Sequence, residues 1–94
     1  MGKRDDSPVI ATVPLNHPAP QKVHEILSQL HKMERGVIAT MFNELAHGKE
    51  GVTAEFQWGQ CVGFSAALFF TGNIDVYQQN ELCAHALDLR KQRN

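Results

Sequence analysis

Residues 54–71, AEFQWGQCVGFSAALFFT, decide which fold this chain can adopt. The stretch carries a single charged residue, Glu55, and its small residues Gly59, Gly63 and Ala67 recur every four positions. That spacing aligns the three along one side of an α-helix, where another helix can approach closely. Because apolar side chains occupy most of the remaining circumference, this helix must be covered on several sides.

The same stretch is too short and too polar to be a membrane anchor. Its uncharged apolar part, CVGFSAALFF, has ten residues, whereas a membrane-spanning helix needs about 20. Glu55, Gln57 and Gln60 precede that part. The sequence therefore predicts a buried helix and no membrane span.

Turn signals on both sides of Gly72 predict a helical hairpin at the C-terminal end. Thr53 is a favourable N-cap for the first helix, and Gly72 directly after Thr71 is typical of a helix end. Asp75 caps the next helix, and Gln78 three residues later completes the pattern of a capping box. This second helix extends into the basic end of the chain, RKQRN.

Upstream of the hairpin, apolar residues at spacings of three and four predict one long helix over residues 20–47. Gly36 marks a possible bend or close contact, because a helical glycine costs about 1 kcal/mol relative to alanine. This helix is longer than either helix of the hairpin. We therefore expect it to overhang them and to offer Leu27, Leu30 and Met33 to a second copy of the chain.

The predicted fold is all-α, a three-helix bundle-like domain over residues 20–94 that consists of the long helix and the C-terminal hairpin. All four prolines lie within residues 1–20, which predicts an extended, mobile Pro-rich arm over residues 1–19. A chain of 94 residues forms one small domain with a limited core. Self-association adds stability to such a domain, and we expect a homo-oligomer.

No motif in the sequence points to catalysis or to a cofactor. There is no glycine-rich phosphate loop, and Ser65 lies in the buried stretch without an adjacent base. The beginning of the chain lacks the apolar run of a secretory signal, so we expect a reducing cytoplasm and two free thiols, Cys61 and Cys83. A metal site that combines both thiols with one histidine remains an open alternative, but we expect no metal.

The function that these features favour is protein–protein interaction, with an unidentified protein partner and with a second copy. A net charge of −1 argues against a dominant phosphate-binding role. Aromatic and arginine residues dominate interface hot spots, and the candidates for partner binding are Trp58, Tyr77, Arg35 and Phe56. Trp58 is also interpretable as a residue at the boundary of the core. Two alternatives stay open: nucleic-acid binding through Lys32, Arg35 and the basic end, and binding of a small anionic ligand in an oligomer cleft.

Residues 63–87, GFSAALFFTGNIDVYQQNELCAHAL, resemble a helical hairpin found in short accessory proteins of phages and plasmids. In those hairpins an apolar helix ends at a glycine, and a capped second helix begins at an aspartate or a serine. The resemblance implies a small helical protein that binds a host machine as an inhibitor or adaptor. It assigns no functional residue.

Overall fold

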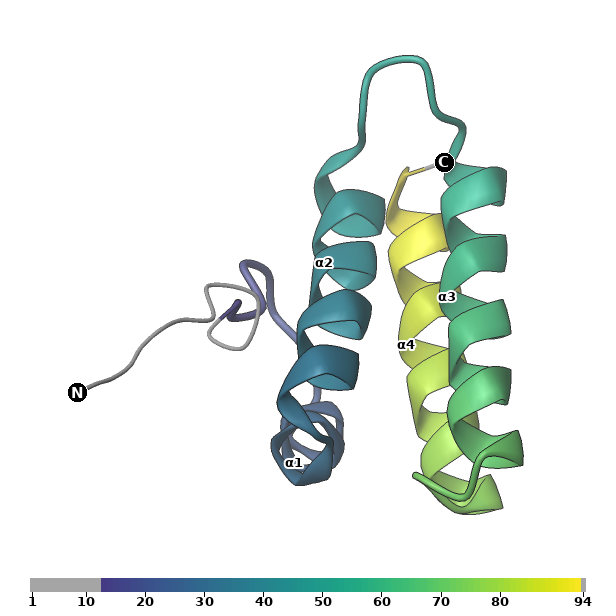
Figure 1. The fold of residues 1–94 in the computed structure, drawn as a ribbon. Coiled ribbons are helices and arrows are strands. Elements are labelled where there is room, and N and C mark those ends of the chain that lie inside the picture. Colours follow the sequence, from purple (N-terminus) through teal and green to yellow (C-terminus); the bar gives the residue numbers. More distant parts are fainter. Residues whose placement is uncertain (1–12, 94) are drawn as a thin grey trace, which may run out of the picture.

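The structure is a computed structural model that describes residues 13–93, and in this part of the chain it contains four α-helices (Figure 1). They are α1 (Gln21–Gln29), α2 (Lys32–His47), α3 (Ala54–Phe70) and α4 (Val76–Arg93). The helix α3 runs antiparallel to α2 and α4, and α1 lies beside the end of the bundle where α2 begins (Figure 1). The prediction of an all-helical fold is confirmed for the described residues, but the layout has four helices rather than three.

The predicted long helix is interrupted between α1 and α2. Leu30 (φ −77°, ψ 156°) and His31 (φ −61°, ψ 154°) have extended backbone, which stops the helical hydrogen bonds. The interruption turns α1 against the bundle and buries Leu27 and Leu30, each 6% exposed, in the core. The prediction that these two leucines overhang the hairpin and face a second copy is therefore wrong. Gly36, predicted to mark a bend or a close contact, lies buried inside α2.

The predicted ends of α3 and α4 are confirmed. The Thr53 hydroxyl accepts a hydrogen bond of 3.1 Å from the backbone N–H of Phe56. The capping box is reciprocal: the N–H of Gln78 donates to Asp75 Oδ1 and the N–H of Asp75 donates to Gln78 Oε1, both at 2.8 Å. Gly72 has a φ of +79°, a left-handed conformation that glycine adopts at helix ends without strain.

The core lies between α2, α3 and α4, and α1 closes one side of it. Each helix contributes one apolar face, as the spacing predicts. The core residues with 2% exposure or less are Val23, Ile38, Ala39, Phe42, Leu45, Cys61, Leu68, Leu82, Ala86 and Leu89. Burying such side chains contributes about 25 cal/mol per Å² of apolar surface removed from water.

A segment that we call the strap, residues 13–20, lies against α2 and α4 before α1 begins. The side chain of Asn43 on α2 holds it at two points: Asn43 Oδ1 accepts from the N–H of Asn16, and Asn43 Nδ2 donates to the carbonyl of Pro14, both at 2.9 Å. The rest of the predicted arm, residues 1–12, lies outside the described residues.

Candidate interaction surface

The outward side of α3 is exposed, and its one charged residue, Glu55 in the first turn, is paired with Arg90. Residues that point inward, such as Cys61 and Ser65, are fully buried. On the opposite side, six exposed residues fall within an arc of about 100°, given 3.6 residues per turn. They are Phe56, Gly59, Gln60, Gly63, Ala67 and Phe70, and we call this set the α3 outer face. Its two phenylalanines are 60% and 81% exposed, which is unusual for large apolar side chains on one surface.

In the described part of the chain, no helix packs against the glycines of this row. A Cβ atom added at Gly59 or at Gly63 would meet no atom within 4 Å. The four-residue spacing correctly places Gly59, Gly63 and Ala67 on one side of the helix. The core forms on the other side of α3, where Cys61 and Leu68 are buried.

Apart from Gln60, the α3 outer face is symmetric along its length. Phe56 and Phe70 each lie seven residues from Gly63, so the face spans about 21 Å at 1.5 Å per residue. Reversing the helix direction about Gly63 exchanges the two phenylalanines and leaves the small residues between them. The same pattern therefore reads in both directions.

An apolar groove of about 450 Å³ adjoins this face between α2 and α3. Met33, at the start of α2, lines the groove together with Phe64 and Ala67 on α3. Met33 is 63% exposed, unlike the two leucines predicted with it. The structure thus brings together five of the predicted contact residues, which are Phe56, Gly59, Gly63, Ala67 and Met33.

The remaining candidates for partner binding lie apart from this surface. Trp58 is half-buried in the contact between α3 and α4, where the guanidinium of Arg90 lies 4.6 Å from the centre of its ring. Arg90 also forms an ion pair of 2.9 Å with Glu55. Arg35 is half-buried on α2 beside the strap. Tyr77 is 78% exposed at the start of α4.

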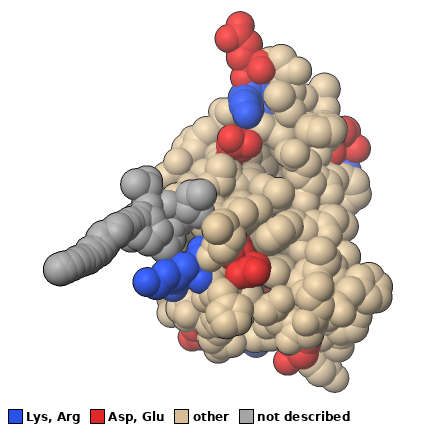
Figure 2. Space-filling model, in the orientation of Figure 1, with Lys and Arg blue, Asp and Glu red and all other residues tan. Residues whose placement is uncertain are grey.

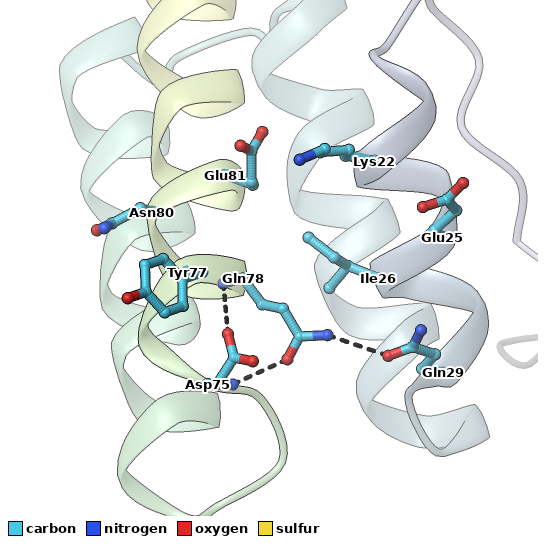
Figure 3. A pocket seen from close by; sticks show the side chains of 9 residues that line it. All are labelled: Lys22, Glu25, Ile26, Gln29, Asp75, Tyr77, Gln78, Asn80 and Glu81. Atoms are coloured by element: carbon cyan, nitrogen blue, oxygen red, sulfur yellow. Dashed lines mark hydrogen bonds between the residues drawn. The ribbon is translucent and has the colours of Figure 1, made fainter.

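Tyr77 borders a second groove of about 530 Å³, between α1 and α4 (Figure 3). Gln78, besides capping α4, donates across this groove to Gln29 Oε1 at 3.0 Å. Lys22 of α1 and Glu81 of α4 point toward each other across it (Figure 3). The other charged residues that line the groove are Glu25 and Asp75. Three carboxylates against one ammonium group make this groove unfavourable for an anionic ligand.

The basic end of the chain serves the fold. Arg93 Nη1 donates to the carbonyl of Leu45 at 2.9 Å and to Gln57 Oε1 at 2.6 Å. Because Arg90 lies over the ring of Trp58, both arginines of the basic end contact other residues of the chain. Figure 2 shows charged side chains of both signs scattered over the visible face. This arrangement weakens the nucleic-acid alternative, which requires clustered and accessible cations.

Burial raises the pKa of both thiols, which lowers their reactivity. Both cysteines are free, and burial raises the pKa of the Cys61 thiol to about 12. The hydroxyl of Ser65 donates to the carbonyl of Cys61 at 2.8 Å, so it is held inside the helix. Among residues 13–93, no three histidine, cysteine or carboxylate side chains are arranged to hold a metal ion.

Comparison of the chain with protein-family models, with curated proteins and with solved structures gave no match. None of the helices in the described part is long and apolar enough to cross a membrane. Sequence reasoning overlooked Phe70 as a contact residue, because the apolar spacing did not show which side of α3 faces the solvent.

Proposed function

We propose that this chain is a small protein–protein interaction module that pairs with a second copy of itself through the α3 outer face. The observation that carries the proposal is the pattern of that face: two exposed phenylalanines at equal distances from Gly63, with small and uncovered residues between them. A monomer would leave this apolar surface in water along the whole length of α3.

A second copy fits this surface better than an unrelated helix does. A two-fold interface uses the same patch on both subunits, so the patch must complement itself. With two α3 helices antiparallel and crossing at Gly63, Phe56 of each copy lies near Phe70 of the other. The glycines permit close approach of the two backbones, and no charge on either face opposes the contact.

The dimer acts by contact with another protein, as an inhibitor or adaptor of host machinery in the cytoplasm. The resemblance of residues 63–87 to phage and plasmid accessory proteins supports this class of function. Pairing through α3 leaves Tyr77 and its acidic groove free in both subunits, so the dimer presents that surface twice. Two linked copies of one binding surface raise the avidity for a partner that has matching sites.

The test is the molar mass of the protein in solution, measured by light scattering after size-exclusion chromatography. We expect twice the monomer mass of 10.5 kDa for the wild type and the monomer mass for Phe70→Gln. Tyr77→Gln is the matched control, because it removes an equally exposed aromatic ring outside the α3 outer face, and it should stay dimeric. A monomeric wild type, or a Phe70→Gln variant that remains dimeric, would overturn the proposal.

A further inference from the structure

We propose that the strap is a pH-sensitive latch, which acid releases from α2 and α4 by protonating the histidine pair formed by His17 and His85. This inference goes beyond the proposed pairing, because the latch involves the strap and the α2–α4 side of the bundle and no residue of α3. It rests on the geometry of the pair and on the groups around it.

The two histidines share one hydrogen bond between their ring nitrogens. His17 Nε2 and His85 Nε2 are 3.0 Å apart, the ring planes differ by 12°, and the ring centres are 5.1 Å apart. The centres are farther apart than the nitrogens by nearly two ring radii, so both nitrogens lie close to the line that joins the centres. This geometry suits an almost linear N–H···N bond, in which one nitrogen donates and the other accepts.

Such a bond tolerates one added proton but not two. With both rings neutral, or with one protonated, a lone pair remains on one Nε2 to accept the hydrogen. When both rings are protonated, each Nε2 carries a hydrogen and each ring a positive charge, so the bond is lost and the rings repel each other. The pair therefore titrates as a unit, and the second proton opens the latch.

The surroundings keep the pair neutral at ordinary pH. His85 is 4% exposed, and its ring meets the ring of Phe42 edge-on, with centres 4.9 Å apart. Burial lowers the pKa of His85 from 6.5 to about 4. Burial also lowers the pKa of His17, partly offset by a hydrogen bond with the side chain of Asn43.

Other titratable groups near the pair come from three helices. His24 of α1 disfavours protonation of both rings, His47 of α2 disfavours that of His17, and Asp88 of α4 favours that of His85. Within residues 13–93, no group on α3 contributes to either shift. His47 Nε2 donates to the carbonyl of Asn16 at 3.0 Å, a bond that survives protonation because the imidazolium remains a donor.

Release of the strap has a defined structural consequence. Val13, Leu15 and Ala19 pack against the core from the strap, and they leave it when the latch opens. The two hydrogen bonds of Asn43 to the strap do not titrate, so they hold the closed state until the histidine pair is doubly protonated. Acid then uncovers apolar surface on α2 and α4, next to Phe42.

The experiment is amide hydrogen exchange of the full chain by NMR, expressed as protection factors corrected for intrinsic rates, from above pH 6.5 down to pH 4. The N–H of Asn16 reports the latch, since it donates to Asn43, and the N–H of Leu68 reports α3. We expect the Asn16 protection to fall by about tenfold per pH unit over part of this range, the slope for uptake of one proton. The Leu68 protection should stay well above the Asn16 protection at every pH, because the bundle remains folded when the strap opens.

Two variants make the test specific. His17→Gln removes the titrating partner and keeps a hydrogen-bonding side chain, so its strap should lose the pH dependence. His31→Gln changes an exposed histidine outside the cluster and should behave as the wild type does. In the wild type, the ring signals of His17 and His85 should shift at the same pH at which the Asn16 protection falls. An unchanged Asn16 protection, an equal loss in His17→Gln, or equal protection of Asn16 and Leu68 throughout this pH range would each refute the latch.

Discussion

Replacing Arg93 by alanine tests whether the basic end of the chain stabilises the fold. Arg93 donates to two acceptors, the carbonyl of Leu45 and Gln57 Oε1, and Gln57 is 1% exposed. A hydrogen bond to a charged group contributes about 1.5–3 kcal/mol, and a buried acceptor left unpaired costs about 1–3 kcal/mol. Because Arg93 itself is partly exposed to water, the lower end of these values applies.

We therefore expect Arg93→Ala to lower the free energy of unfolding by about 2–2.5 kcal/mol. In a domain of this size, 1 kcal/mol corresponds to about 4–8 °C in Tm, so the Tm should fall by at least about 8 °C. Urea unfolding followed by circular dichroism measures the change. The matched control is Lys91→Ala, because Lys91 is an exposed cation in the same turn of α4. This change should lower the free energy of unfolding by no more than about 0.5 kcal/mol.

A double-mutant cycle identifies the cause of the loss. Gln57→Leu combined with Arg93→Met removes both the donor and its buried acceptor, so the pair of changes should cost less than the sum of the single changes. Equal losses for Arg93→Ala and Lys91→Ala would refute the reasoning. In that case Arg93 would be available to a ligand, and nucleic-acid binding would become the favoured function.

The free energy of unfolding should be constant above pH 6.5 and fall by up to about 3 kcal/mol toward pH 4, because the unfolded state binds the proton that buried His85 excludes. Urea titrations at several pH values measure this free energy, and a value independent of pH would contradict the prediction. Gly63→Leu should keep the helical circular dichroism spectrum, since nothing lies within 4 Å of its added Cβ, and should halve the molar mass. A disulfide reagent at neutral pH should modify Cys83 well before Cys61, which is buried with a pKa of about 12; equal rates would show that α3 opens readily.

The ends of α3 and α4 were predictable because the signals for them are local. Thr53, Asp75 and Gln78 bond to backbone groups within three residues along the chain, and Gly72 supplies the left-handed residue that stops α3. Such interactions depend on side-chain chemistry at fixed offsets and hardly on the rest of the fold.

The interruption after α1 was not predictable in the same way. Neither Leu30 nor His31 is a proline or a glycine, and the apolar spacing from Leu27 to Met33 continues through the break. The break is instead stabilised by tertiary contacts, which bury Leu27 and Leu30 against the bundle. Local helix propensity is a weak preference that such burial overrides.

The candidate site shows the same division between local and tertiary information. The four-residue spacing correctly placed Gly59, Gly63 and Ala67 on one side of α3. Whether that side faces the core or the solvent depends on which of two apolar faces packs on α2 and α4. When a helix is apolar nearly all round, its sequence does not show which face packs on the core. The exposure of Phe70 therefore became evident only in the fold.

The position of Trp58 gives the protein an optical probe of its own. It is the only tryptophan in the chain, and it lies in the contact between α3 and α4, beneath the guanidinium of Arg90. Its indole Nε1 is buried, so loss of the α3–α4 contact would expose the ring to water and shift its emission to longer wavelength. Opening of the strap or separation of two copies leaves that contact in place. Intrinsic fluorescence therefore distinguishes unfolding of the bundle from either of these smaller events in a single unlabelled sample.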